Sequence, residues 1–319
     1  MTKKTIRNSL LLVLTAAIWG FAFVAQSIGG DAIGPSAFNL IRFPIGALVL
    51  LPFIGIRKLA GKDSRAPHGK KDRKNLILGG MFCGLALCVA SSFQQFGITL
   101  GTSAGKAGFL TACYILIVPI LGLFFKKRCG FTVWIGVAIT LVGLYLLCMD
   151  GSFSVQFSDL LVLICALCFS VQILIVDHYC PIVDGVRLAC IQFAFSGLFS
   201  IIPTFIFDMH CDISEIDGII NSLQNPNAVI PVLYAGVMSC GIAYTLQIVA
   251  QDGLNPTVAS LLMSLESVFS VVGGCLILHQ VPSLKEFIGC ALMFVAICLA
   301  QIDPALFKKS RRIEKESGK

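Results

Sequence analysis

Long apolar runs separated by short polar segments dominate the sequence. Ten of these runs reach the roughly 18 or more residues that an α-helix needs to cross the hydrocarbon core of a bilayer. They occupy residues 10–28, 35–56, 76–98, 103–125, 131–149, 158–178, 187–207, 229–250, 255–278 and 285–301. The pattern therefore predicts an all-α integral membrane protein with ten transmembrane helices, and it leaves little chain for a soluble domain.

The ninth predicted span, residues 255–278, contains a single carboxylate, Glu266, at its middle. A helix of this length rises about 36 Å, so Glu266 is expected at mid-membrane. Helical spacing places it on a face of small and polar residues, namely Ala259, Met263, Ser270 and Gly273. The opposite face is apolar and is expected to contact lipid: Leu261, Leu265, Val268, Val272 and Leu276. Because a charge at the centre of a transmembrane helix costs about 2.5–3.5 kcal/mol, we predict that Glu266 faces a central cavity.

The composition agrees with a membrane protein, since 56% of the residues are hydrophobic, 13% are charged and the mean hydropathy is +0.88. The net charge of +7 could indicate an anionic partner. However, all but three of the 24 Lys and Arg residues fall on one side of the membrane if the amino terminus is cytoplasmic. This positive-inside asymmetry predicts a multi-pass protein of the cell (plasma or inner) membrane with both termini cytoplasmic. The basic residues thus orient the chain and contact membrane lipid, and nucleic-acid binding is disfavoured.

The 14 cysteines lie almost entirely within the predicted spans. Cys165 and Cys168 have CxxC spacing, but on an apolar membrane helix such residues are more often small packing residues than a redox or metal pair. The four histidines fall in loops or at span ends, which gives no metal cluster from proximity in sequence. We therefore expect no disulfide framework, no metal site and no cofactor.

The second half of the chain repeats the first. The best match joins the fifth and tenth spans, where identical residues recur at an offset of 153, from Ile135 and Ile288 to Asp150 and Asp303. The expected units are two five-helix repeats and a basic cytoplasmic tail, at residues 8–150, 157–303 and 304–319.

Each repeat has an odd number of spans, so the second copy enters the membrane from the opposite side and the two repeats are inverted. In transporters built in this way, the substrate site lies near the midplane at the interface of the repeats, and one half rocks against the other. The repeat therefore predicts a transporter that works by alternating access.

Polar and aromatic residues inside the spans are the candidate substrate-binding groups. They are Trp19, Gln26, Arg42, Gln94, Gln95, Lys106, Tyr114, Gln172, Tyr244, Gln247 and Glu266. As a set they predict a mixed aromatic and polar cavity, which suits an organic metabolite better than a bare ion. The sequence predicts no catalytic or metal-binding residue.

Glu266 and Lys106 are the sharpest candidates for a functional pair, because an intramembrane ion needs a partner. Simpler interpretations remain open. Glu266 could form a structural hydrogen bond to a neighbouring helix, and Lys106, one turn into its helix, could extend to the outer interface, as could Arg42. The glutamines could join helices, each such bond contributing about 0.6–2 kcal/mol.

Three motifs give the chain a family resemblance. They are Trp19-Gly20-Phe21 in the first span, Thr102 to Thr111 with Tyr114 and Pro119 in the fourth, and Leu265-Glu266 in the ninth. In these motifs, and over essentially its whole length, the chain resembles the drug/metabolite transporter (DMT) superfamily in its ten-helix EamA-type branch.

The resemblance implies export of metabolites or xenobiotics through a central cavity between two five-helix repeats. Pro119 is expected to interrupt the fourth span. In the ninth span Ser267 stands where the family usually has proline, so no helix break is implied beside Glu266.

A competing interpretation is an intramembrane enzyme or a sensor without transport activity. No histidine lies near a span centre to serve a hydrolase, and no GxxxxGK motif is present to bind a nucleotide. The sequence therefore favours a gradient-driven transporter of a small-molecule substrate, not an enzyme. Glu266 is the only acid near mid-span, so protons are the favoured coupling ion. The expected assembly is a monomer or a homodimer.

Overall fold

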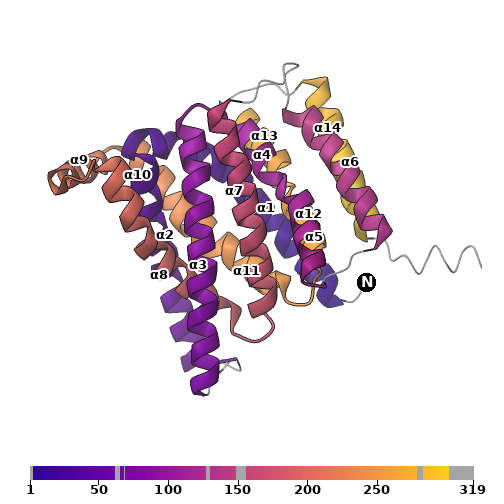
Figure 1. Cartoon of the computed structure of the whole chain (residues 1–319), viewed down its shortest axis with the longest axis horizontal. Coiled ribbons are helices and arrows are strands. Elements are labelled where there is room, and N and C mark those ends of the chain that lie inside the picture. Colours follow the sequence, from indigo (N-terminus) through magenta and orange to yellow (C-terminus); the bar gives the residue numbers. More distant parts are fainter. Residues whose placement is uncertain are drawn as a thin grey trace, which may run out of the picture.

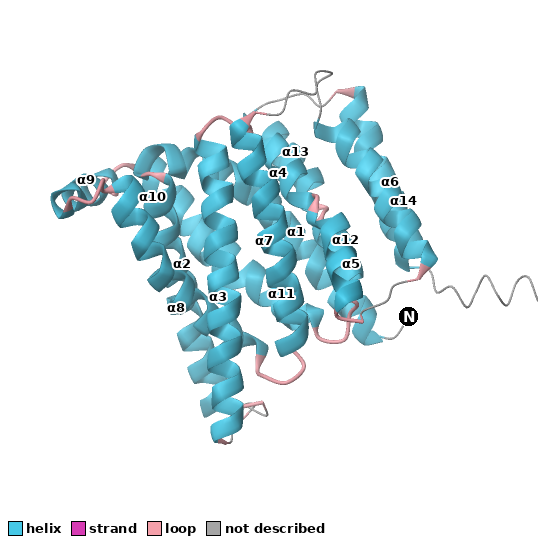
Figure 2. Ribbon diagram, viewed as in Figure 1, coloured by secondary structure: helices cyan, strands magenta, loops and turns pink. Residues whose placement is uncertain are grey.

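A computed structural model of the protein describes residues 3–61, 65–67, 69–126, 130–148, 156–278 and 283–301. The described residues form helices joined by short turns, without a strand (Figure 2). Eight helical spans are long and apolar enough to cross a membrane, and two shorter apolar stretches, Phe131–Leu146 and Phe287–Ala296, complete the set. These ten segments agree with the ten predicted spans. The predicted tail at 304–319, Asp150 and Asp303 lie outside the described residues.

The first half of the chain contributes five spans. They are α1 (Lys3–Ile33), α2 (Pro35–Leu59), α3 (Lys70–Thr99), α4 (Ala104–Ala112) followed by α5 (Tyr114–Phe124), and α6 (Phe131–Cys148).

The second half also contributes five. They are α7 (Phe157–Tyr179); α8 (Gly185–Pro203) with the π-helical turn η1 (Thr204–Asp208); α10 (Pro226–Leu233), the π-helix η3 (Tyr234–Tyr244) and α11 (Thr245–Gln251); α12 (Pro256–Met263) with α13 (Glu266–Leu278); and α14 (Leu284–Gln301). Because each half has five spans, the two halves run in opposite directions through the bundle. A short 3₁₀ turn, η2 (Ile213–Glu215), and α9 (Ile216–Ser222) lie in the loop between the seventh and eighth spans, at the left edge of Figure 1.

Side-chain caps fix where several helices begin. Asp184 accepts a hydrogen bond from the backbone N–H of Arg187 at the start of α8, and Asn255 does the same for Thr257 at the start of α12. At the start of α2 the capping group comes from another helix. The backbone N–H of Ala37 donates a hydrogen bond to Oδ2 of Asp208 at 2.6 Å. These caps satisfy N–H groups that the helix itself leaves without partners.

Helices of the first half pack mainly on helices of the second. The largest contacts of α3 are with α7 and α8, α2 packs on α8, and α1 packs on α13. By contrast, α6 and α14 pack mainly on each other and stand together at one edge of the bundle (Figure 1). Their backbones approach closely at Gly143, where an added Cβ would lie 2.8 Å from the carbonyl oxygen of Gly289. The hydrophobic core is therefore continuous across the interface of the two halves.

The ninth span differs from the single continuous helix that its length predicts. It breaks at Ser264 and Leu265, between α12 and α13, and Glu266 is the first residue of α13. Serine hydroxyls satisfy carbonyl groups around the break, since Ser264 Oγ donates to Leu261 O (2.7 Å) and Ser267 Oγ donates to Gly108 O of α4 (3.0 Å). The break thus needs no proline, because neighbouring groups supply the hydrogen bonds that irregular backbone lacks inside a membrane.

The prediction that one whole face of this span contacts lipid is correct only for its second half. Val272 and Leu276 are 39% and 65% exposed, whereas Leu261 and Leu265 are buried. Packing explains the difference, because α12 is surrounded by α1, α5, α6, α7 and α14. The first half of the ninth span is therefore an interior element.

The fourth span also breaks, but not at the predicted place. The interruption is at Cys113, between α4 and α5, and α5 continues through Pro119. The backbone N–H of Leu116 bonds to Cys113 O at 3.0 Å, a three-residue step that tightens the turn. The fourth spans of both halves are consequently discontinuous near their middles.

Candidate functional site

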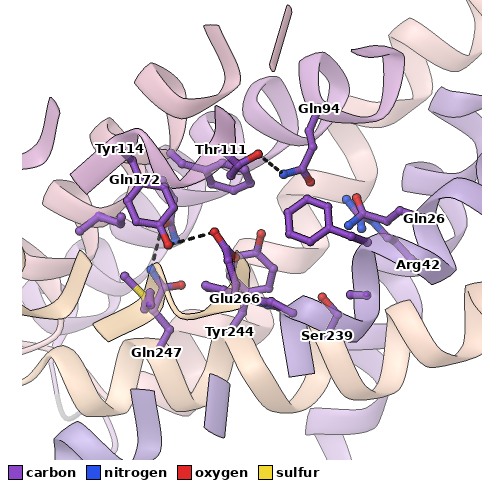
Figure 3. Close-up of a pocket in the computed structure, with 16 residues that line it drawn as sticks. Gln26, Arg42, Gln94, Thr111, Tyr114, Gln172, Ser239, Tyr244, Gln247 and Glu266 are labelled. Atoms are coloured by element: carbon purple, nitrogen blue, oxygen red, sulfur yellow. Dashed lines mark hydrogen bonds between the residues drawn. The ribbon is translucent and has the colours of Figure 1, made fainter. Parts of the chain in front are cut away.

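A cavity lies between the two halves of the chain, at the breaks in the fourth and ninth spans. It is small, with a volume of about 30 Å³ that water-sized molecules could occupy. Eight of the lining residues come from the first half: Trp19, Ala22, Phe23, Gln26, Arg42, Gln94, Thr111 and Tyr114. Eight come from the second half: Phe169, Gln172, Ile173, Ser239, Tyr244, Gln247, Met263 and Glu266. Figure 3 shows the polar members converging on this space.

One hydrogen bond joins the two breaks. Tyr114, the first residue of α5, donates from Oη to Oε1 of Glu266, the first residue of α13, at 3.0 Å. Both side chains are buried, with exposed fractions of 3% each. The bond therefore crosses from one half of the chain to the other at the centre of the cavity (Figure 3).

Amide side chains form a second set of contacts at the cavity. Gln94 Nε2 donates to Thr111 Oγ1 at 3.0 Å. Gln247 Nε2 donates to Gln172 Oε1 at 3.2 Å, and Gln172 Nε2 donates to Gln192 Oε1 at 3.2 Å. This chain of amides joins α11, α7 and α8, so Gln172 and Gln247 hold helices together as well as lining the space, while Gln192 lies behind them.

Aromatic rings line another side of the cavity. The rings of Trp19 and Tyr244 lie 4.6 Å apart between centroids, and Phe193 approaches Tyr244 edge-on at 5.9 Å. The π-helix η3 positions both Ser239 and Tyr244, and its wide turns change which residues face inward. Trp19 and Tyr244 thus give this side of the cavity an apolar, aromatic surface.

Arg42 is buried in the cavity wall and does not extend to the interface. The residue is 3% exposed, and its guanidinium carbon lies 5.3 Å from the ring centre of Phe38 and 5.1 Å from that of Phe43. Both rings offer a cation–π contact. The interpretation of Arg42 as a residue that reaches the outer interface is therefore wrong.

Nine of the eleven predicted residues line the cavity; Gln95 and Lys106 do not. Gln95 Nε2 instead donates to the backbone oxygen of Gln26 at 2.8 Å. The predicted pairing of Lys106 with Glu266 is wrong, because Lys106 Nζ lies 2.6 Å from Asp159 Oδ2. Asp159 also accepts from Thr102 Oγ1 at 3.0 Å, so this cluster forms a separate polar contact between the halves.

The sequence interpretation placed Met263 on the helical face of Glu266 but did not include it among the candidates, nor six other lining residues, which are Ala22, Phe23, Thr111, Phe169, Ile173 and Ser239. Most are apolar or small, and such residues look the same whether they line a cavity or pack in a core. It also missed Asp159, although a signal existed. Asp159 begins its helix on the same side of the membrane as Lys106, and an acid at matching depth is the expected partner of such a base.

Several polar atoms in the cavity wall have no hydrogen-bond partner among the described residues. They are two donors and two acceptors, namely Trp19 Nε1, Arg42 Nε, Gln26 Oε1 and Gln247 Oε1. Buried polar groups normally have partners, so these four atoms are available to hydrogen-bond with water or another molecule in the cavity. Within the described part of the chain, no cluster of three or more His, Cys, Asp or Glu side chains could hold a metal ion.

Comparisons with known proteins agree with the architecture. A protein-family model described as the EamA-like transporter family matches residues 7–149 and 156–301. An uncharacterized transporter of Archaeoglobus fulgidus is 27% identical over 304 residues, covering 94% of this chain and 87% of the relative. The uncharacterized transporter YdfC of Bacillus subtilis is 25% identical over 309 residues, covering 95% and 93%. A crystal structure with 17% identity superposes with a TM-score of 0.70 over 97% of this chain and 99% of the other.

Proposed function

Because the chain belongs to the EamA-like transporter family, we propose that this membrane transporter is a secondary transporter that exports a small organic metabolite or xenobiotic by alternating access. Its substrate would bind in the cavity around Tyr114 and Glu266. Opening that cavity to one side of the membrane and then to the other requires the two halves to move against each other.

The observation that carries this proposal is the meeting of two broken helices at one hydrogen bond. In secondary transporters, discontinuous helices at corresponding positions of two repeats mark the binding site. Here the breaks at Cys113 and at Ser264–Leu265 lie in the fourth span of each half, and the Tyr114–Glu266 bond joins them. The equal contribution of both halves to the lining supports the same assignment.

We propose proton coupling through Glu266. It is the only carboxylate that lines the cavity, and one neutral hydroxyl is its donor among the described residues. A carboxylate in this setting can exchange a proton with either side as the halves move, whereas one held by a cation would keep its charge.

The lining supports transport over catalysis. Among the described residues that line the cavity, Ser239 has no histidine beside it to act as a general base. We therefore propose that the protein is not an enzyme. The relatives above are also named as transporters.

The proposed location is the cell membrane with both termini cytoplasmic, which puts the loop between the seventh and eighth spans outside. Cys211 in that loop is exposed. A membrane-impermeant maleimide added to intact cells should label the wild-type protein, and Cys211→Ser should remove that label. If labelling of Cys211 requires broken cells, the orientation is reversed.

Transport itself can be tested without knowing the solute. Purified protein would be placed in proteoliposomes loaded with a low-molecular-mass extract of cell metabolites, and mass spectrometry would follow which compounds leave. We expect a small set of organic compounds to leave faster than from protein-free liposomes, and an imposed pH gradient to change that rate. Efflux equal to the protein-free control would refute transport, and efflux insensitive to the gradient would refute proton coupling alone.

A further inference from the structure

Arg42 is the buried charge that the architecture leaves unexplained. It lines the cavity at 3% exposure, and its Nε has no hydrogen-bond partner. In the part of the chain that the structure describes, Lys4, Arg57, Arg65 and Lys106 each form an ion pair with an aspartate, whereas Arg42 has no carboxylate partner. A cation removed from water requires compensation, and no described carboxylate supplies it.

Glu266 is not that compensating group. Its Oε1 accepts from Tyr114, and no ion pair joins it to Arg42 among the described residues. Figure 3 shows Arg42 beside Gln26 at one side of the cavity, with Glu266 beside Tyr244 nearer its middle. The wall therefore presents an unpaired cation and a carboxylate at different places.

The rings around Arg42 hold it in position without satisfying its hydrogen-bonding groups. Phe38 and Phe43 contact the guanidinium, and Phe43 in turn stacks on Phe193 at 6.4 Å between ring centres. A guanidinium fixed in this way presents a planar fork of donors. That fork matches the two oxygens of a carboxylate, which it can bind through two parallel hydrogen bonds.

We propose that Arg42 binds the anionic group of the substrate, and that the substrate is an organic monoanion, a carboxylate with a flat apolar body. The body would lie against the rings of Trp19 and Tyr244. A single negative charge is favoured because Arg42 and Glu266 are the two charged side chains of the lining. A second negative charge on the ligand would meet the carboxylate of Glu266. This inference rests on the proposed function, since it names the substrate class of the same cavity.

Three probes with one skeleton separate the possibilities: 4-methylbenzoate, 4-methylbenzylamine and 4-methylbenzyl alcohol. Their binding to the purified protein would be measured by thermal shift, because a ligand that binds the folded state raises its melting temperature. We expect the acid to bind and the amine and alcohol to bind at least about tenfold more weakly, since hydrogen bonds to a charged group are the stronger ones. Equal binding of all three, or no shift with the acid, would overturn the proposal.

Variants then assign the effect to Arg42. Arg42→Gln should weaken binding of the acid about 10- to 100-fold, as expected for the loss of a bidentate charged contact. Arg42→Lys keeps the charge without the fork, so we expect an intermediate loss; it also serves if the glutamine variant does not fold. Arg57→Gln is the matched control, because Arg57 pairs with Asp184 away from this cavity and should leave acid binding unchanged. Unchanged acid binding in both Arg42 variants would refute the role of Arg42.

A fourth probe, 4-methylphenylphosphonate, distinguishes the two common sources of an anionic group. We expect it to bind more weakly than the carboxylate because it carries more negative charge towards Glu266. Tighter binding of the phosphonate would support an anion site at Arg42 but would overturn the proposal that the substrate is a carboxylate. The two proposals fail separately: if the metabolite efflux above contains only cations or neutral compounds, transport stands and the anion site falls, whereas efflux equal to the protein-free control refutes transport itself.

Discussion

Asp159 and Glu266 are both buried carboxylates on membrane-spanning helices of the second half, with exposed fractions of 2% and 3%, yet their partners differ. Asp159 receives a hydrogen bond from the ammonium of Lys106 (2.6 Å), one from Thr102 (3.0 Å) and one from the backbone N–H of Gln156 (2.9 Å). Among the described residues, Glu266 receives one, from the neutral phenol of Tyr114 at 3.0 Å.

We propose that this difference separates a structural carboxylate, Asp159, from one that acts in transport, Glu266. Three donors, one of them a cation, fix the charge of Asp159 and fasten α7 to the start of α4. A single phenol leaves Glu266 with hydrogen-bonding capacity to spare inside a cavity. Burial alone therefore does not distinguish the two acids, whereas the number and charge of their donors do.

The largest expected effect on stability is that of replacing Asp159, the carboxylate with three hydrogen-bond donors. Asp159→Asn removes the charge that holds the ammonium of Lys106, and hydrogen bonds to charged groups contribute about 1.5–3 kcal/mol each. We expect a lower melting temperature in detergent, with transport per folded molecule preserved. A variant as stable as wild type would mean that this cluster does not fasten the halves together.

A smaller effect, on transport, is expected at the single donor of Glu266. Tyr114→Phe keeps the ring and deletes the hydroxyl, a loss of about 0.5–1.5 kcal/mol for one hydrogen bond. Transport should fall by up to about tenfold, since 1.4 kcal/mol corresponds to a factor of ten. The stability of the variant should be close to that of wild type. Full transport in the variant would show that the phenol does not position Glu266.

The smallest effect is expected at the break itself. Ser267→Ala removes the hydrogen bond from α13 to Gly108 O of α4, and such bonds in membranes average about 0.6 kcal/mol. We expect a slight loss of stability and a modest loss of transport. Ser260→Ala is the control, because its hydroxyl bonds to Thr257 O within its own helix. Equal effects of the two changes would argue that the contact between the broken helices has no special role.

The ten spans and the meeting of nine predicted residues at one cavity could be derived from sequence. Helical spacing fixes which residues share a face, and polar residues on apolar helices must face inward. The break beside Glu266 could not be predicted in this way, because it depends on a hydroxyl of one helix reaching a carbonyl of another. No local signal such as proline marks it.

The π-helix η3 and the pairing of Lys106 with Asp159 could not be predicted from the sequence for related reasons. The π-helix η3 packs closely on α2, where a Cβ added to Gly236 would lie 2.6 Å from Cγ2 of Ile45, and such packing is decided between helices and not by local sequence. The pairing of Lys106 with Asp159 depends on which helix starts lie side by side. The fourth and sixth spans are neighbours in space but not along the chain.

We propose that Glu266 acts in transport while Asp159 acts in folding, and one paired measurement tests this division of roles. Glu266→Gln and Asp159→Asn are both carboxylate-to-amide changes of nearly constant size. Each variant would be compared with wild type for melting temperature and for metabolite efflux from proteoliposomes per folded molecule. We expect Glu266→Gln to keep the wild-type melting temperature but lose most of its efflux, and Asp159→Asn to melt at a lower temperature but keep its efflux. Wild-type efflux from the Glu266→Gln variant would contradict this proposal.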